Sequence, residues 1–297
     1  MAAARSLSGR RVLITGPARG IGAALAEQLA RRGARLALVG LESERLANLA
    51  ARCGDGTFVV RCDVSDSAQV TDAVDRAAAA LGGLDAVVAN AGIATSGPLR
   101  LHDLRSWERL IEINLLGVMY TDRAALPHIE RTGGYLLNIA SAAAIARAPG
   151  MTAYCTAKAG VEALSDCLRV EMQGLGVQVG VAYFTFLDTD MVRDVAREAP
   201  AVDRPESRIE RLVGRTYPLE SAVNELVAAI AHRRRRVAYP RWLLPALAFR
   251  QLFASPLVER LSAKAGRESL AAYEQLVAER GAQAASATER TRKLAGL

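Results

Sequence analysis

The sequence predicts an α/β fold in which a doubly wound parallel sheet lies between two layers of helices, a three-layer αβα arrangement. Short apolar runs alternate with longer helical patterns along most of the chain, as in sheets built from strand–helix–strand units. The chain has 297 residues, of which 51% are hydrophobic, enough for one large core. We expect one domain over residues 8–240, an apolar helical extension over 241–280, and a frayed helix or disordered tail over 281–297.

The first predicted strand, Arg11 to Thr15, leads into a glycine-rich loop. The loop reads Gly16-Pro-Ala-Arg-Gly-Ile-Gly22 and precedes the helical run Ala23 to Arg32. A glycine turn between a strand and a helix exposes backbone N–H groups at the helix N-terminus, where a pyrophosphate can bind. This order of elements indicates a dinucleotide site of the Rossmann type.

The second predicted strand, Leu36 to Val39, bears on which dinucleotide binds. In dinucleotide folds an acidic residue near the end of this strand bonds the adenosine ribose of NAD. Here Gly40 stands at that end and Glu42 follows only later, while Arg19 in the glycine loop could pair with a 2′-phosphate. We therefore predict a preference for NADP. Alternatively, Arg19 is merely solvated and Glu42 reaches the ribose of NAD.

Two further strands end in polar or glycine-containing segments. Phe58 to Arg61 leads into Cys62-Asp63-Val64, where Asp63 could meet the adenine or cap the following helix. Ala86 to Ala89 leads into Asn90-Ala-Gly92, whose glycine permits close approach of the backbone to a ligand. The next helical pattern, Trp107 to Ile129, carries Asn114 among apolar neighbours, so its amide needs partners, structural or a water.

The fifth strand, Tyr135 to Ile139, precedes Ser141, and the helix Ala153 to Gln173 carries Tyr154 and Lys158. The spacing of four residues puts Tyr154 and Lys158 on one helix face. A lysine ammonium about 4 Å away would lower a tyrosine pKa by up to about three units, and a serine hydroxyl can orient a substrate oxygen. This trio can exchange a proton with an alcohol or carbonyl, but moving a hydride needs a redox cofactor.

The rest of the chain completes the fold. Val177 to Tyr183 is the sixth strand, and the polar stretch from Phe184 to about Arg215 is a candidate substrate lid. Ser221 to His232 is a helix with Ser221 as N-cap, and Val237 to Tyr239 is the last strand.

The C-terminal extension begins with the apolar segment Trp242 to Val258. Phe249, Leu252, Phe253 and Leu257 approximate one apolar helix face, although Pro256 requires a break or a new helix start. With Arg233 to Arg236 upstream, residues 233–258 could touch an anionic membrane surface. The same face could instead close the substrate pocket or contact another subunit, and we favour these structural interpretations.

Composition excludes several classes of protein. The net charge of +7 comes from arginines scattered along the chain, without the aromatic–basic interleaving of nucleic-acid modules. Four cysteines show no disulfide framework and three histidines show no metal-binding spacing, so we expect no metal and a cytoplasmic protein. No signal peptide and no spanning helix are predicted.

Together these motifs resemble the short-chain dehydrogenase/reductase family over about residues 8–240. Thr15-Gly16-x-x-x-Gly20-Ile21-Gly22 is similar to its cofactor loop, and Asn90-Ala91-Gly92 to its N-A-G motif. The catalytic tetrad of the family falls on Asn114, Ser141, Tyr154 and Lys158. The family often has Pro-Gly where this chain has Phe184-Thr185, while Thr189 keeps the place of a residue that contacts the nicotinamide amide.

The resemblance implies a role for each of these residues. Tyr154 would be the acid/base, Lys158 would bind the nicotinamide ribose and lower the Tyr154 pKa, and both Ser141 and Tyr154 would contact the substrate. Asn114 would hold a relay water. The implied cofactor contacts are Gly16, Arg19, Gly20, Ile21, Gly22, Asp63, Val64, Asn90, Ala91, Gly92, Tyr154, Lys158 and Thr189.

We therefore expect an NAD(P)-dependent oxidoreductase that interconverts a secondary alcohol and a ketone, on a lipophilic substrate resembling a steroid, retinoid or acyl group. The resemblance implies a homodimer or homotetramer. Two alternatives use the same fold: a cofactor-binding regulatory or scaffold protein, and a lyase or epimerase that keeps the hydride on the enzyme.

Overall fold

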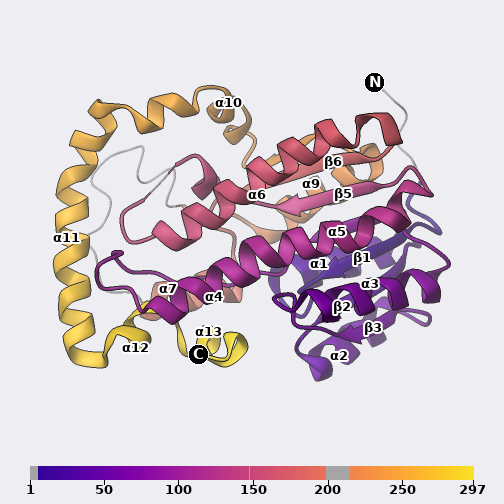
Figure 1. Ribbon diagram of the computed structural model, residues 1–297, viewed down its shortest axis with the longest axis horizontal. Coiled ribbons are helices and arrows are strands. Elements are labelled where there is room, and N and C mark those ends of the chain that lie inside the picture. Colours follow the sequence, from indigo (N-terminus) through magenta and orange to yellow (C-terminus); the bar gives the residue numbers. More distant parts are fainter. Residues whose placement is uncertain (1–5, 147, 199–214) are drawn as a thin grey trace.

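A seven-stranded sheet forms the centre of the protein (Figure 1). We describe a computed structural model, which covers residues 6–146, 148–198 and 215–297. All strand pairs are parallel and follow the order β3-β2-β1-β4-β5-β6-β7, so the order reverses between β1 and β4. The strands are β1 Arg11–Thr15, β2 Arg35–Gly40, β3 Phe58–Arg61, β4 Ala86–Ala89, β5 Tyr135–Ile139, β6 Gln178–Phe184 and β7 Arg236–Tyr239.

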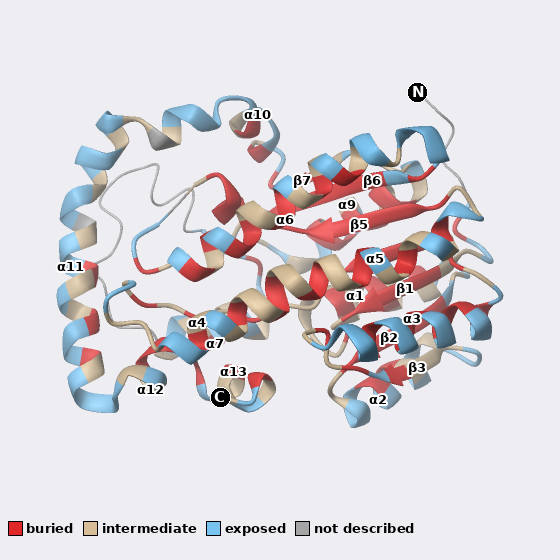
Figure 2. Cartoon of the chain, viewed as in Figure 1, coloured by how far each residue is buried: buried red, intermediate tan, exposed pale blue. Residues whose placement is uncertain are grey.

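Helices cover both faces of this sheet, which confirms the doubly wound fold predicted from the sequence. Side chains alternate along each strand, so Leu13 packs on one face while Val12 and Ile14 pack on the other. The first face is covered by α3 Ser67–Leu81, α4 Leu104–Ile111, α5 Gly117–Glu130 and α6 Thr152–Glu171. The second is covered by α1 Gly20–Ala30, α2 Ser43–Cys53 and α9 Leu219–His232. The sheet is accordingly buried while outer helix faces are exposed (Figure 2).

Some helix boundaries differ from the predictions. The long helix expected over Trp107 to Ile129 is divided by a π-helical turn, Glu112–Leu116, which contains Asn114. An inserted turn of this kind leaves the apolar periodicity nearly unchanged, so the sequence does not reveal it. Ser221 does not cap α9, which begins two residues earlier, after Pro218. Likewise Asp66 rather than Asp63 caps α3, because its carboxylate accepts hydrogen bonds from the first helical turn.

The extension after β7 folds into separate helices. They are α10 Leu243–Ala248, a 3₁₀ turn Arg250–Ala254 and the 25-residue α11 Pro256–Arg280, which begins at the proline with Ser255 as N-cap. The prediction of one apolar helix face is wrong, because the break at Ser255 separates its members. Phe249, Leu252 and Leu257 are each about two-thirds exposed. Figures 1 and 2 show α11 as a largely exposed arm at one end of the molecule.

The last residues are helical, where the sequence predicted a frayed helix or disorder. They form α12 Ala282–Ser286 and α13 Glu289–Ala295, and the chain returns beside α4 and α7 Asp190–Glu198 (Figure 1). The Ser286 hydroxyl accepts a hydrogen bond from the Asp103 backbone N–H at 2.9 Å, and Arg109 donates to the Ala295 carbonyl at 2.8 Å. The tail has little apolar periodicity of its own, so these contacts with distant segments help to hold it in place.

Across the described ranges, no helix combines the length and the apolar character needed to span a bilayer.

Candidate functional site

A deep pocket opens at the carboxyl ends of the strands, where the strand order reverses. It runs from the glycine-rich loop before α1 to the side chains of Ser141, Tyr154 and Lys158. Nearly all the residues proposed from the sequence line it, namely Gly16, Arg19, Gly20, Ile21, Asp63, Val64, Asn90, Ala91, Gly92, Asn114, Ser141, Tyr154, Lys158 and Thr189. Parallel sheets of this type bind ligands at such a crevice.

Gly22 is the exception, because it lies behind the pocket and does not line it. A Cβ there would come within 2.6 Å of Asn90 Nδ2 and 2.8 Å of Pro17 Cα, so only glycine fits. Asn90 in turn donates hydrogen bonds to the carbonyls of Thr15 and Gly16, at 3.0 and 3.1 Å. Together these contacts hold the end of β4 against the glycine loop.

The N-terminus of α1 faces the pocket without a side-chain cap. Arg19 is in an extended conformation at the N-cap position and makes no capping hydrogen bond, and the first turn has no acidic residue. Gly20 and Ile21 in this turn line the pocket. Uncapped N–H groups at the positive end of a helix dipole are a binding site for an anion such as a pyrophosphate.

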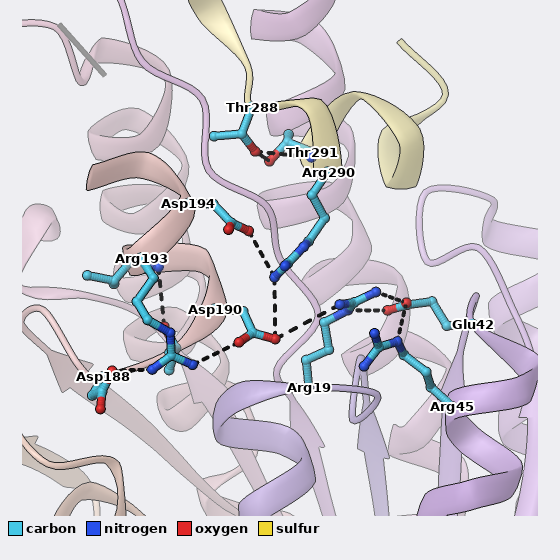
Figure 3. A network of polar contacts seen from close by, with 12 residues as sticks. Arg19, Glu42, Arg45, Asp188, Asp190, Arg193, Asp194, Thr288, Arg290 and Thr291 are labelled. Atoms are coloured by element: carbon cyan, nitrogen blue, oxygen red, sulfur yellow. Dashed lines mark hydrogen bonds and ion pairs between the residues drawn. The ribbon is translucent and has the colours of Figure 1, made fainter. Parts of the chain in front are cut away.

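Arg19 is already paired with acidic side chains (Figure 3). Its guanidinium binds Glu42 through two hydrogen bonds, one of 2.9 Å from Nε, and lies 3.9 Å from an oxygen of Asp190. Glu42 also pairs with Arg45 at 3.3 Å. The Arg19–Glu42 pair therefore stands at the side of the pocket formed by the end of β2.

Asp63 lines the same side of the pocket. Burial raises the pKa of its carboxyl, but hydrogen bonds from Ser65 and from the Arg109 guanidinium outweigh burial and hold the pKa below its usual range. Asp63 Oδ1 accepts from the Ser65 hydroxyl at 2.7 Å, and its Oδ2 accepts from Arg109 at 2.6 Å. This side chain is therefore an anchored carboxylate at neutral pH.

Ser141, Tyr154 and Lys158 meet at the inner end of the pocket. Lys158 Nζ lies 5.7 Å from the centroid of the Tyr154 ring, as their spacing of four residues on α6 predicts. Ser141 follows β5 and its hydroxyl lies 3.3 Å from the carbonyl oxygen of Phe184. The lysine is buried and donates a 2.8 Å hydrogen bond to the carbonyl of Ile139.

The electrostatics of this trio differ from the expectation that Lys158 lowers the Tyr154 pKa. Burial raises the pKa of Tyr154 and exceeds the opposing effect of its hydrogen bond with Ser141. Burial also lowers the pKa of Lys158 to about 8. The Lys158 ammonium donates to the Ile139 carbonyl, and Lys158 is not among the groups that shift the Tyr154 pKa.

Asn114 is fully buried in the π-helical turn, and both ends of its amide bond the backbone of one neighbour. Its Oδ1 accepts from the Ile93 N–H at 2.8 Å, and its Nδ2 donates to the Ile93 carbonyl at 2.9 Å. The side chain thus fixes the loop after β4 at the edge of the pocket. The sequence predicted that this amide needs hydrogen-bond partners, and in the structure these are the backbone N–H and carbonyl of Ile93.

The segment after β6 forms another wall. Phe184, Thr185, Leu187 and Thr189 line the pocket. The Thr185 hydroxyl is buried and makes no hydrogen bond to any described residue. It could therefore bond a ligand in the pocket. Residues 199–214 of the lid expected up to Arg215 lie outside the described residues.

Sequence reasoning missed one wall entirely. Thr288, Arg290, Thr291 and Leu294, all from the C-terminal tail, line the pocket together with Asp190 and Asp194 of α7. Thr288 before Glu289 is a local signal for a helix start, and Thr288 does cap α13. However, the residues around Thr288 do not predict which part of the protein this helix packs against. In contrast, no described residue of 241–258 lines the pocket. Closing the pocket was one of the roles that the sequence suggested for this segment.

Comparisons with known proteins agree with this geometry. A family model described as short chain dehydrogenase matches residues 10–200. The chain is 38% identical over 189 residues to the D-threitol dehydrogenase of Mycolicibacterium smegmatis, covering 62% of this chain and 73% of the relative. It is 36% identical to the cis-4-hydroxycyclohexanecarboxylate dehydrogenase of Sinomonas cyclohexanicum, covering 68% and 83%.

A solved structure of a short chain dehydrogenase/reductase from Burkholderia phymatum in complex with NAD superimposes with a TM-score of 0.71 and 26% identity, covering 83% of this chain and 93% of the other. The family match spans more than half of the chain, including the glycine loop, the Asn90-Ala-Gly92 segment and the trio at the inner end of the pocket. This chain therefore belongs to the short-chain dehydrogenase/reductase family of oxidoreductases.

Proposed function

We propose that this enzyme interconverts a secondary alcohol and a ketone, with Tyr154 as general acid/base and NAD(H) as the redox partner. The meeting of Ser141, Tyr154 and Lys158 at the inner end of a pocket that begins at the uncapped N-terminus of α1 supports this most. A proton-transfer group and a dinucleotide-binding helix end open into one cavity. Alcohol–ketone chemistry needs both.

The residues of the pocket fit a nicotinamide dinucleotide. The α1 N-terminus would hold the pyrophosphate, the β2 side with Glu42 and Asp63 would hold the adenosine, and Lys158 and Thr189 would hold the nicotinamide half. The unpartnered Thr185 hydroxyl offers a hydrogen bond to a polar group at that end. When bound, the cofactor supplies or accepts the hydride.

The chain's own residues would handle the proton. Ser141 would hold the substrate oxygen against Tyr154, and the Tyr154 hydroxyl would donate its proton to a ketone or take one from an alcohol. The phenol is protonated at neutral pH, which is the form that donates to a ketone, although burial raises the Tyr154 pKa and so makes it a weaker acid. Asn114 would keep the loop at Ile93 in place rather than contact the substrate.

We propose NAD(H) as the preferred cofactor. The prediction of NADP(H) relied on an Arg19 that is available to a 2′-phosphate, but Glu42 already binds that guanidinium. A 2′-phosphate would have to displace Glu42 and remain beside its negative charge, which disfavours it. Glu42 lines the pocket and is also an acceptor for ribose hydroxyls. Titration of the purified protein with NADH and NADPH decides between them.

We keep the proposal of a lipophilic substrate, now based on the pocket itself. Apolar side chains line the same pocket as the polar trio, namely Ile93, Ile113, Leu187, Met191 and Leu294. Each buried CH₂ contributes about 0.8 kcal/mol, so kcat/KM should rise roughly threefold to fourfold per added CH₂ in a series of secondary alcohols. A series with flat or falling kcat/KM would contradict a lipophilic substrate.

Two statements about partners stay predictions. A homodimer or homotetramer is implied by the family, and light scattering of the purified protein tests it. Contact of residues 233–258 with anionic membranes predicts co-sedimentation with anionic vesicles that is lost at high salt. Within that segment Arg234 and Arg241 both pair with Glu225, and Arg236 pairs with Asp166, which reduces the charge available to lipids.

The reaction class is tested by following cofactor absorbance across panels of steroid, retinoid, acyl and sugar alcohols and the matching ketones. We expect stoichiometric oxidation or reduction of the dinucleotide with at least one panel. If substrate turns over without any net change in the cofactor, the enzyme is instead a lyase or epimerase. If cofactor binds but no panel reacts, the result favours the regulatory or scaffold alternative.

A further inference from the structure

The C-terminal tail supplies an arginine to the dinucleotide pocket. Arg290 on α13 lines the pocket together with Gly20 and Ile21 of α1, 270 residues earlier in the chain. The family match ends at residue 200, so it does not include this segment. The tail is nonetheless held in place by hydrogen bonds with Ala94, Asp103 and Arg109.

One carboxylate stands between Arg290 and the helix end where a pyrophosphate would bind (Figure 3). Arg290 Nη1 lies 3.3 Å from Asp190 Oδ2, and Arg19 Nη1 lies 3.9 Å from the same oxygen. Asp190 follows Thr189, whose Cγ2 is only 3.4 Å from the position that a Cβ would take on Gly20. Two guanidiniums thus share an anion beside the first turn of α1.

The contacts of Arg290 leave hydrogen-bonding capacity unused. Its Nη1 is buried and only 2.8 Å from Asp194 Oδ2, yet neither atom makes a well-directed hydrogen bond to any residue that the structure describes. A buried donor without a directed partner is costly, and a second acceptor would relieve that cost. A pyrophosphate has the charge and the several oxygens that a planar guanidinium binds best.

We propose that Arg290 is a cofactor-binding residue that contacts the pyrophosphate of the dinucleotide, and that the tail 282–297 forms the outer wall of its pocket. This inference rests on the proposed function, because it assumes that a dinucleotide occupies the pocket. Its chemistry is specific to the diphosphate, so Arg290 should matter for ligands that contain the diphosphate and not for the nucleoside alone.

The test compares affinities for NADH, ADP-ribose and adenosine by calorimetry, with adenosine measured by competition. In Arg290→Ala we expect affinity for NADH and ADP-ribose to fall about tenfold, the size of one charge-assisted contact, and affinity for adenosine to stay unchanged. Lys293→Ala is the matched control, because it removes the same charge from an exposed position of the same helix, and it should change neither.

Asp194→Asn separates ligand binding from tail docking. If Arg290 only fastens the tail to α7, removing its closer partner at Asp194 should lower ADP-ribose affinity, though by less than Arg290→Ala does, because Asp190 on the same helix remains. Under our proposal Asp194→Asn should instead raise that affinity, because it removes a competing negative charge. A loss of ADP-ribose affinity in Asp194→Asn, an equal loss for adenosine in Arg290→Ala, or no loss in Arg290→Ala would each overturn the inference.

The wild-type measurement distinguishes a failure of the proposed function from a failure of the role of Arg290. A wild-type protein that binds neither NADH nor ADP-ribose contradicts the proposed function and the role of Arg290 together. A wild-type protein that binds both, alongside an Arg290→Ala variant that binds them equally well, contradicts the role of Arg290 alone.

Discussion

Tyr154 and Lys158 show how a side chain's chemistry depends on what surrounds it. Their spacing of four residues predicted that they share a helix face, and the 5.7 Å separation of ammonium and ring agrees. The spacing could not show that burial dominates both titrations, raising the Tyr154 pKa and lowering that of Lys158 to about 8. Burial depends on the packing of residues from several strands and helices, which no local pattern encodes.

The buried lysine predicts a pH dependence of stability. Its pKa of about 8 in the folded protein lies below the ordinary lysine value of 10.5, so burying the charged form costs stability at lower pH. Between these values the unfolded chain holds one more proton than the folded one, and the free energy of unfolding rises with pH. The shift corresponds to on the order of 3 kcal/mol at most.

Urea melts of wild type and Lys158→Met across about pH 8 to 10 measure this contribution. The wild type should gain stability over that range relative to Lys158→Met, which lacks the titrating group. Parallel curves for the two proteins would show that Lys158 titrates at its ordinary pKa.

We expect the substitution Glu42→Gln to shift the cofactor preference from NADH towards NADPH. Glu42→Gln keeps the size of the side chain but removes the charge that holds Arg19 and repels a 2′-phosphate. We expect NADPH to bind about tenfold more tightly to the variant, since one charge-assisted contact becomes available, while NADH affinity falls or stays level. Titration of both proteins with both cofactors measures it. An unchanged preference would place the 2′ position away from Arg19.

At the scale of elements, the sequence identified all seven strands because each is a short, mainly apolar run, and the strands inside the sheet are buried on both faces. It failed where structure depends on distant partners. The π-helical turn at Asn114 serves the backbone of Ile93, and the tail helices α12 and α13 depend on Asp103 and Arg109. A tail rich in Ala, Arg, Thr and Glu carries no strong periodicity, so it resembled disorder.

At the junction of β1, β4 and α1, we expect one added methyl group, in Gly22→Ala, to lower both stability and NADH affinity. In Gly22→Ala the new Cβ would meet backbone atoms of Pro17 and Gly16 at 2.8 and 2.9 Å, and these cannot move without displacing the cofactor loop. Overpacking of this kind costs about 1–3 kcal/mol, and NADH affinity should fall as well. Gly174→Ala is the control, because a Cβ there meets nothing within 4 Å.

Thermal melts and NADH titrations of both variants measure the difference. Gly174→Ala should be neutral or slightly stabilising, since alanine restricts the unfolded chain more than glycine does. A Gly22→Ala variant as stable as Gly174→Ala would mean that the loop can move away from α1.

For the molecule as a whole, three distant parts of the chain build one pocket. The glycine loop before α1, the trio around α6 and the C-terminal tail at Arg290 all line it, although α11 carries the chain far from the sheet in between (Figure 1). The first two parts carry recognisable motifs, so the sequence predicted both them and their meeting. The third carries none, and only the folded chain shows that it belongs to the site.

Turnover by Tyr154→Phe tests the proposed chemistry most directly. The substitution removes one hydroxyl at the inner end of the pocket and alters no residue of the glycine-rich loop. We expect NADH to bind with wild-type affinity while turnover of the best secondary alcohol falls by about 10²-fold or more, the usual contribution of a general acid/base. Turnover close to wild type, with NADH affinity intact, would show that another group moves the proton and would contradict the role of Tyr154.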